Sequence, residues 1–500
     1  MFFRYVIPPA GKIILVKSSP SHAVAAAGRR EAEVMKINAL HVDLNSAMLR
    51  PETIRAMLRA AATAGKNAIL WEVEDKVRWE SCPDVPHPDA MDKAAFRALL
   101  AESRALGLEP IPLLQTFGHA EYVLLKPGRE HLREVSEFHD CYCASNADAR
   151  AFLRDLAREY RELFGPLRFF HFGGDEAYRF GSCPACAARD RMALYAEHLL
   201  AVTAETRAAG IRVLIWDDMV RHDPARLAAA LPPREVALCH WEYGPWPAEP
   251  DASAPPTDYA KARELAAHGF DVAVCGAASC WGDDPFLPRY ARHAPNLVSA
   301  RVAGAALLGS VDTSWTVRLV PKLLQLPLFA ADPATALARE LPGLAPDAAL
   351  SALRRVSQWE ADLQFFLGVG WNGCKDSLPP PSDWFARRVA ERPEVAARMR
   401  EAVPAMLDAV GAAADEIAVA HPGAGPDSFV AVLLEGAALK RGLLRACAGA
   451  LGAGPALPAE EFAVLRARTE AYYAREMTPA TAARAADIAW GVFGPRPRPA

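Results

Sequence analysis

The sequence predicts an α/β fold, a (β/α)8 TIM barrel followed by an α-helical C-terminal region. Short apolar runs rich in β-branched and aromatic residues recur along the first two thirds of the 500-residue chain, with Ala/Leu/Arg-rich segments of helical periodicity between most of them. Continuous apolar strands that alternate with helices indicate a parallel sheet. Eight such units over about 280 residues agree with the size of a closed barrel. A doubly wound sheet is the alternative, but no Gly-rich phosphate-binding pattern follows the first strand.

Each strand is predicted from one apolar run. In chain order the predicted strands are 37–44, 67–74, 109–116, 168–175, 211–218, 236–243, 271–279 and 304–315. The helical periodicity between them is clearest at 52–64, 93–106 and 147–164. The last strand is the weakest prediction, because Gly304 and Gly309 dilute its apolar pattern.

The pattern changes after the eighth strand. We expect a short N-terminal extension at 1–34, the barrel at 35–332 and an α-helical region at 333–500. Helices are predicted in that last region at 347–367, 393–420, 428–451 and 459–477. Three roles stay open for these helices: covering the barrel, forming a homodimer, or shaping one side of its mouth.

Composition is that of an ordinary globular protein, with 52% hydrophobic and 23% charged residues and a net charge of −4. No basic stripe is present, so nucleic acid is not an expected partner. No window reaches the roughly 18 uninterrupted apolar residues of a membrane span. Pro8, Pro9 and Lys12 interrupt the N-terminal apolar patch, so a signal peptide is not expected. With ten cysteines in 500 residues, we expect a cytoplasmic protein with mostly free thiols.

Polar and aromatic side chains gather where the predicted strands end, which is the face that carries the active site of a barrel. The most informative segment is 169–176, FFHFGGDE, in which an apolar strand runs into two glycines and then two acids. Two acids are costly to bury unless they meet something polar or charged. Adjacent strand residues point to opposite faces, so we expect the chain to turn at the glycines and the two acids to have unequal roles.

Carboxylates together with tryptophans around one barrel mouth indicate a sugar ligand, since indole faces stack on pyranose rings. The residues of this segment and of the segments around it resemble those of a known family. The sequence HFGGDE at 171–176 resembles the H-x-G-G-D-E signature of glycoside hydrolase family 20, the β-N-acetylhexosaminidases. Flanking segments resemble the intracellular hexosaminidase D branch: HVDLNSAM, WEVEDKVRWE, PLLQTFGHAEYVL, HLREVSEF and VLIWDDM. The resemblance covers roughly residues 35–320.

The resemblance implies a retaining exo-glycosidase that releases terminal β-linked GlcNAc or GalNAc without a cofactor. In this family the 2-acetamido oxygen of the substrate attacks the anomeric carbon and an oxazolinium intermediate forms. By the resemblance Glu176 is the general acid/base, and Asp175 orients the acetamido group and stabilises the positive charge. The substrate-binding residues that it implies are His119, Glu74, Asp75, Trp216, Asp218, Trp241 and Trp315.

Three recognition elements depart from the family pattern. An Arg is expected after the first strand, where this chain has Asp43-Leu44-Asn45-Ser46. A Tyr-x-Asp/Asn motif is expected after the seventh strand, where residues 277–282 read AASCWG. A Glu is expected two positions after Trp315, where Val317 stands. Two alternatives therefore stay open: a barrel acting on a non-acetylated or otherwise modified amino sugar, and a carbohydrate-binding barrel without catalysis. A metal-dependent hydrolase is disfavoured, because the 13 histidines form no HxH or HExxH pattern.

Two close pairs of cysteines flank the predicted catalytic strand. Cys141 and Cys143 precede it, and Cys183 and Cys186 follow it. Four thiolates in two such pairs can bind structural zinc. A C-x-C pair is, however, poorer zinc spacing than a second C-x-x-C, and cytoplasmic cysteines are often simply buried. We therefore expect no metal in the site and keep zinc at these four residues as the lesser alternative.

Overall fold

The computed structural model describes residues 36–244, 258–317, 319–360, 362–367 and 383–493. The predicted extension at 1–34 lies outside these ranges. The described residues belong to one compact unit. Among the residues described, no helix is long and apolar enough to cross a membrane.

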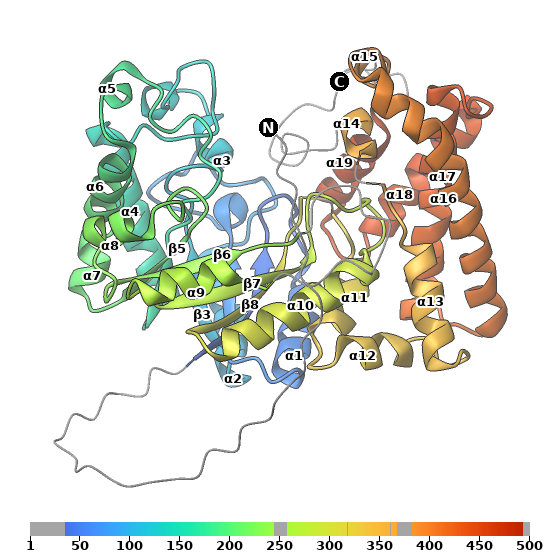
Figure 1. The fold of residues 1–500 in the computed structure, drawn as a ribbon, viewed down its shortest axis with the longest axis horizontal. Coiled ribbons are helices and arrows are strands. Elements are labelled where there is room, and N and C mark those ends of the chain that lie inside the picture. The colour runs from blue at the N-terminus through green and yellow to red at the C-terminus, as the bar shows by residue number, and fades with distance from the viewer. Residues whose placement is uncertain (1–35, 245–257, 318, 361, 368–382, 494–500) are drawn as a thin grey trace, which may run out of the picture. The chain divides into compact units, whose positions relative to one another are not determined.

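The strands form a closed barrel in which each strand pairs in parallel with the next, and β8 pairs with β1 (Figure 1). The predicted (β/α)8 barrel is therefore confirmed. The strands are β1 (Ile37–Asp43), β2 (Ala68–Glu72), β3 (Glu109–Leu113), β4 (Phe169–His171), β5 (Arg212–Trp216), β6 (Val236–Trp241), β7 (Val272–Ser279) and β8 (Gly309–Ser314). Each lies inside a segment that the apolar runs predict, because strands covered on both faces must be apolar almost throughout.

The helices that connect the strands follow amphipathic segments of the sequence. The longer ones are α1 (Pro51–Thr63), α2 (Lys93–Ala105), α4 (Ala147–Phe164), α6 (Arg191–Val202), α8 (Pro224–Ala230), α9 (Ala260–Ala267) and α10 (Tyr290–Ala305). Shorter turns of helix are η1 (Glu74–Lys76), α3 (Glu121–Leu124), η2 (Glu130–Leu132), α5 (Pro184–Ala187) and α7 (Ala204–Ala208). In α4 the Asn146 side chain accepts hydrogen bonds from the first-turn amides of Asp148 and Ala149, which explains why this helix starts where it was predicted.

The start of the eighth strand was predicted five residues too early. Residues 304–308 do not belong to β8, because α10 continues to Ala305. Gly304 lies so close to the start of β8 that an added Cβ would stand 2.3 Å from the Gly309 carbonyl oxygen. The glycine thus permits close packing of a helix end on a strand, and the local sequence pattern does not distinguish this from a weak strand.

Helices dominate the chain after the barrel. They are α11 (Lys322–Gln325), η3 (Leu326–Phe329), α12 (Pro333–Arg339), α13 (Pro346–Val356), α14 (Leu363–Leu367), α15 (Trp384–Glu391), α16 (Pro393–Ala420), α17 (Phe429–Leu451), α18 (Ala459–Tyr473) and α19 (Pro479–Trp490). The single helix predicted at 347–367 is wrong, because α13 ends at Val356 and α14 is separate from it. The Ser357 hydroxyl donates to the Leu353 carbonyl (2.7 Å) where α13 ends. Helix α19 was not predicted.

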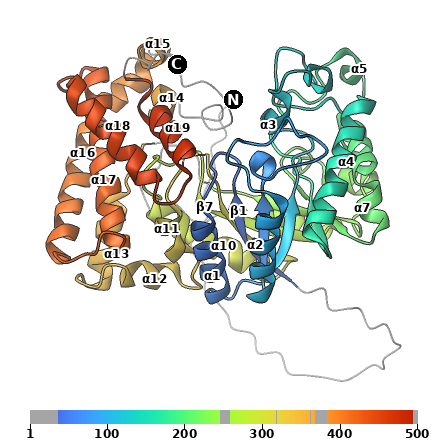
Figure 2. The ribbon, with the colours of Figure 1, turned by 180° about the vertical axis from the view of Figure 1, so that it is seen from behind.

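The long helices pack against one another and on the loop that follows β7. Figure 2 shows α16 beside α17, and α18 beside α19. From this layer the Lys440 ammonium reaches Asp284 in that loop, with Nζ 2.9 Å from Oδ2. The hydroxyls of Tyr472 and Tyr473 donate to the carbonyls of Phe286 (2.8 Å) and Pro285 (2.7 Å). The helices thus hold a loop at the barrel mouth. The boundary near residue 332 stays a prediction.

The Lys440–Asp284 pair is fully buried, with both side chains 0% exposed. Burial lowers the pKa of Lys440 and raises that of Asp284, so neither charge is tolerated there alone. We predict that Lys440→Met or Asp284→Asn alone lowers the free energy of unfolding by about 3–5 kcal/mol, because each leaves a buried group without its partner. The free energy of unfolding of the double variant should fall by less than the sum of the losses in the two single variants.

Urea unfolding of the four proteins measures this coupling. The exposed Arg445–Glu461 pair is the matched control, since exposed pairs contribute about 1 kcal/mol or less. The prediction would be contradicted if Lys440→Met lowered the free energy of unfolding by no more than Arg445→Gln does.

Candidate active site

A cavity opens where the barrel strands end. Its lining combines carboxylates with aromatic rings: Asp43, Asn45, Ser46, Glu72, His119, Asp175, Glu176, Trp241, Tyr243, Cys280, Trp281, Trp315 and Val317. Five of the residues predicted for the site therefore line one cavity: His119, Asp175, Glu176, Trp241 and Trp315. The other four, Glu74, Asp75, Trp216 and Asp218, are not part of its lining.

The end of β4 turns sharply and brings both acids to this cavity. Gly173 and Gly174 have φ of 63° and 99°, a backbone region that glycine adopts readily. A Cβ at Gly174 would stand 2.3 Å from the Tyr195 hydroxyl, so a side chain has no room there. Adjacent acids that would point to opposite faces of a strand instead share the cavity wall.

Asp175 and Glu176 meet at the imidazole of His119. His119 Nε2 lies 3.1 Å from Asp175 Oδ2 and 3.6 Å from Glu176 Oε2. Asp175 is only 5% exposed, and its Oδ1 accepts no hydrogen bond from the part of the chain that the structure describes. On the outer side, the Tyr178 hydroxyl donates to Glu176 Oε1 (2.9 Å). A buried carboxylate oxygen without a partner, on the wall of a cavity, suits a donor from a ligand.

Asp218 supports the turn from behind. Its Oδ2 accepts the Glu176 backbone N–H (3.0 Å), and its Oδ1 accepts the Trp241 indole N–H (3.3 Å). Burial, and next the charge of Asp175, raise the pKa of Asp218 to about 7. The residue thus holds two parts of the cavity wall without lining the cavity.

Of the predicted tryptophans, Trp216 is buried beneath the cavity, and Trp241 and Trp315 line it. Trp216 is fully buried in the barrel interior, and its ring centroid lies 5.7 Å from that of Trp315 above it. Trp315 lines the cavity and donates its indole N–H to the Tyr243 hydroxyl (3.0 Å). Trp241 stacks on Tyr243, with centroids 5.4 Å apart. Tyr243 was not among the predicted site residues, although its place at the end of the sixth strand was a signal for it.

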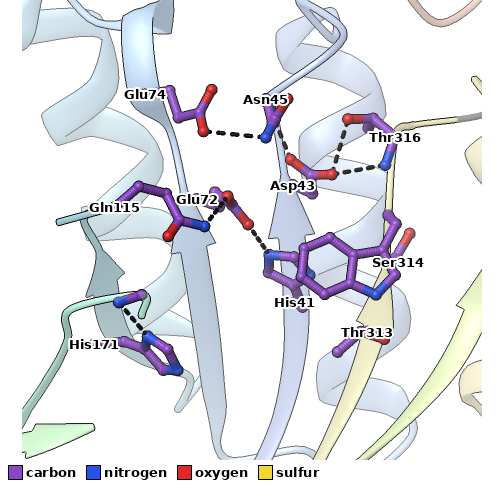
Figure 3. Close-up of polar contacts among 12 residues, drawn as sticks. His41, Asp43, Asn45, Glu72, Glu74, Gln115, His171, Thr313, Ser314 and Thr316 are labelled. Atoms are coloured by element: carbon purple, nitrogen blue, oxygen red, sulfur yellow. Dashed lines mark hydrogen bonds and ion pairs between the residues drawn. The ribbon is translucent and has the colours of Figure 1, made fainter. Parts of the chain in front are cut away.

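A network of buried polar side chains joins the ends of β1, β2, β3 and β8 (Figure 3). Glu72 interacts with His41 Nε2 (3.1 Å) and accepts from Gln115 Nε2 (3.0 Å). Asp43 Oδ2 accepts from the Thr316 amide (2.7 Å) and hydroxyl (2.9 Å). Burial, and next the nearby Glu72 charge, raise the pKa of Asp43. Acidic groups therefore stand where the family pattern has an Arg.

Glu74 and Asp75 lie at the edge of this network. Glu74 accepts from the Asn45 amide group (3.0 Å), and Asn45 lines the cavity. Asp75 pairs with Lys76. Glu74, His119 and Glu176 all have positive φ, of 40°, 53° and 44°. Non-glycine residues held in this region cost of order 1–3 kcal/mol each and cluster at functional sites.

The cysteine pairs come together only in part. Cys143 Sγ lies 3.7 Å from Cys183 Sγ and 3.8 Å from Cys186 Sγ. Cys141 does not belong to this group, since its thiol donates to the Tyr142 carbonyl. Glu134, which the sequence did not indicate, joins the three thiols instead.

The raised pKa of Asp218 predicts a pH-dependent contribution to stability. A folded-state pKa of about 7, above the usual 3.8, means that the folded protein binds this proton more tightly than the unfolded chain does. The contribution is therefore fully present below pH of about 3.8 and is lost as the pH rises through about 7. We predict that wild type loses stability relative to Asp218→Asn between about pH 4 and pH 7.

Thermal or urea unfolding of both proteins across this range measures the difference. Subtracting the variant removes the contribution of other groups, such as His240, whose pKa is raised to about 9. A difference that does not change with pH would refute the prediction.

Comparisons with known proteins agree with this geometry. The model of the glycosyl hydrolase family 20 catalytic domain matches residues 118–275, which include His119, Asp175 and Glu176. Hexosaminidase D of Bos taurus is 29% identical over 215 residues, or 41% of this chain and 62% of that protein. Hexosaminidase D of Homo sapiens is 29% identical over 214 residues, or 41% of this chain and 44% of that protein. The chain thus spans less than two thirds of either relative.

Solved structures with a related barrel are more distant. A β-N-acetylhexosaminidase from Bacteroides fragilis is 18% identical with a TM-score of 0.45, over 59% of this chain and 65% of that one. A family 20 β-N-acetylhexosaminidase from Streptomyces coelicolor is 18% identical with a TM-score of 0.44, over 60% and 63%. At these scores the fold assignment rests on the strand pairing itself. The matched segment and the relatives show that this barrel resembles the catalytic domain of glycoside hydrolase family 20 and hexosaminidase D.

Proposed function

We propose that this protein is a retaining exo-β-N-acetylhexosaminidase that removes terminal β-linked GlcNAc or GalNAc by substrate-assisted catalysis. The observation that carries the proposal is Asp175 Oδ1, a buried acceptor without a partner among the described residues, beside Glu176 on the cavity wall. An acetamido N–H supplies the missing donor. That hydrogen bond directs the acetamido oxygen at the anomeric carbon.

In the first step the acetamido oxygen forms a bond to the anomeric carbon while the glycosidic bond breaks. Glu176 donates its proton to the leaving oxygen as general acid. Asp175 accepts the N–H and balances the positive charge of the oxazolinium. In the second step water attacks the same carbon, the bond from that carbon to the acetamido oxygen breaks, and Glu176 takes the water proton, so the configuration is retained. His119, 3.1 Å from Asp175, holds that carboxylate in place.

The aromatic wall supports recognition of the acetamido group. Trp241, Trp315 and Tyr243 line the cavity, above the buried Trp216. The indole N–H of Trp315 donates to the Tyr243 hydroxyl, which keeps the hydroxyl proton available for a carbonyl oxygen. We infer that Tyr243 does the work of the Tyr missing after the seventh strand.

Hydrolysis of nitrophenyl β-GlcNAc and β-GalNAc tests the proposed activity. Glu176→Gln keeps the shape of the side chain but cannot donate the proton, so kcat/KM should fall by about 10²–10⁴-fold. Asp175→Asn should also lose activity, because the amide cannot balance the positive charge. Glu109→Gln is the matched control, since Glu109 begins β3 at the other end of the barrel and pairs with Arg168. Full activity of Glu176→Gln would contradict the proposed function.

The role of the acetamido group has its own readout within the same assay. Fluorination of the acetyl group weakens its oxygen as a nucleophile, so the rate should fall steeply with each fluorine. A thiazoline analogue of the oxazolinium should inhibit strongly, as transition-state mimics do. Rates that do not depend on fluorination would exclude substrate assistance.

The inferred role of Tyr243 predicts a selective loss. Tyr243→Phe removes one hydrogen bond to the acetamido oxygen, of about 1 kcal/mol, so kcat/KM on N-acetyl substrates should fall about fivefold. Tyr160→Phe is the control, because the Tyr160 hydroxyl is buried without a partner among the described residues and lies away from the cavity. Equal effects of the two changes would contradict the role.

A second candidate keeps the barrel and changes the sugar. Asp43, Glu72, Asp175 and Glu176 all line the cavity, and His119 is the only basic side chain among its described lining residues. Such a set suits the ammonium of an amino sugar without an acetyl group. Faster turnover of aryl 2-amino glycosides than of their acetylated forms would establish this candidate. Sugar binding without turnover of any of these substrates would favour a carbohydrate-binding barrel.

A further inference from the structure

Three thiols and a carboxylate converge between the loops that follow β3 and β4. Cys143, Cys183, Cys186 and Glu134 each offer one ligand atom, and these atoms all lie within 4.8 Å of one another. Cys143, Cys186 and Glu134 are buried, and Cys183 is partly exposed. We propose that this group binds one Zn²⁺ as a structural site. The proposal does not depend on the sugar chemistry.

Three of the distances between the ligand atoms are those of a tetrahedral zinc site. Two sulfur atoms that each lie about 2.3 Å from a tetrahedral zinc are about 3.8 Å apart. Cys143 Sγ lies 3.7 Å from Cys183 Sγ and 3.8 Å from Cys186 Sγ. A zinc-bound oxygen and sulfur are about 3.6 Å apart by the same geometry, and Glu134 Oε2 lies 3.5 Å from Cys186 Sγ.

Backbone hydrogen bonds hold the ligands in this arrangement. The Glu134 amide donates to the Cys141 carbonyl, and the Cys143 amide donates to the Leu132 carbonyl, both at 2.9 Å. Glu134 and Cys143 thus lie on two antiparallel chain segments that pair at Arg133 and Tyr142. The Cys183 amide donates to Glu134 Oε1 (2.9 Å). This bond occupies one carboxylate oxygen and leaves Oε2 turned toward the thiols, as outer hydrogen bonds orient metal ligands.

A disulfide explains this arrangement less well than a cation does. Cys143 is almost equally distant from both partners, so no single pair of sulfurs is selected. A disulfide would also leave the Glu134 carboxylate buried against uncharged sulfur, which is unfavourable. Thiolates are soft ligands and select zinc over Mg²⁺ or Ca²⁺.

The site would join two loops that carry the reacting groups. The loop after β3 holds His119, Glu134 and Cys143, and the loop after β4 holds Asp175, Glu176 and the other two cysteines. Zinc would therefore fix the loop of His119 against the loop of the two acids. Arg179 and Asp140 make a second link between these loops (2.6 Å).

The metal content of the full-length protein, purified without chelator, tests the proposal. We expect about one zinc per chain. Cys143→Ser and Glu134→Gln should each weaken zinc binding at least about tenfold, by analogy with the effect of lost outer partners. Cys141→Ser is the matched control, because Cys141 is a neighbouring buried cysteine outside the group. It should keep its zinc.

A second measurement uses the wild-type protein, so it does not depend on whether a variant folds. Addition of a thiol-reactive mercurial should release zinc, which a colorimetric chelator records. Replacement by Co²⁺ should give the sulfur-to-metal charge-transfer absorption of a tetrahedral thiolate site.

Three outcomes would overturn the proposal. Less than about a tenth of a zinc per chain, even after incubation with Zn²⁺, rejects a stoichiometric structural site. A Co²⁺ spectrum without thiolate bands rejects the cysteines as ligands. Loss of zinc from Cys141→Ser together with full retention in Glu134→Gln rejects this ligand set in favour of four cysteines.

Discussion

The left-handed turn at the end of β4 is the constraint on which the candidate site depends. A parallel strand delivers consecutive side chains to opposite faces, and only the positive φ of Gly173 and Gly174 brings Asp175 and Glu176 to one wall. Tyr195 occupies the space that a Cβ at Gly174 would need. The turn is therefore enforced by packing as well as permitted by glycine. The backbone strain that continues into Glu176 is opposed by the hydrogen bond from its amide to Asp218.

Several acidic side chains are buried at the barrel mouth. Glu72 is matched to His41 and Gln115, and Asp43 to Thr316, whereas Asp175 and Glu176 both lie beside His119. A buried carboxylate without such a partner is costly at low dielectric. Asp175 keeps one oxygen without a partner among the described residues, and that exception marks the place where a ligand belongs.

The barrel could be predicted because strands covered on both faces are apolar throughout, a property of the local sequence. The acids could be predicted because strand ends in a barrel share one face. Contacts between segments that lie far apart in the sequence could not be predicted in this way. Gly304 reads as part of a strand until its packing against Gly309 is known. Glu134 carries no local signal of its nearness to Cys186, 52 residues away, whereas the spacing of Cys141 gave a misleading one.

The buried Lys440–Asp284 pair limits how the barrel can be cut or recombined. A chain truncated after β8 would retain every carboxylate of the candidate site, yet the loop after β7 would lose its ammonium partner and two tyrosine donors. Cys280 and Trp281, which line the cavity, belong to that loop. Transfer of the barrel to another protein would therefore require either α17 and α18 as well or a redesigned apolar replacement for Asp284. The part of the chain that can be transferred as one unit therefore ends where the helical layer ends.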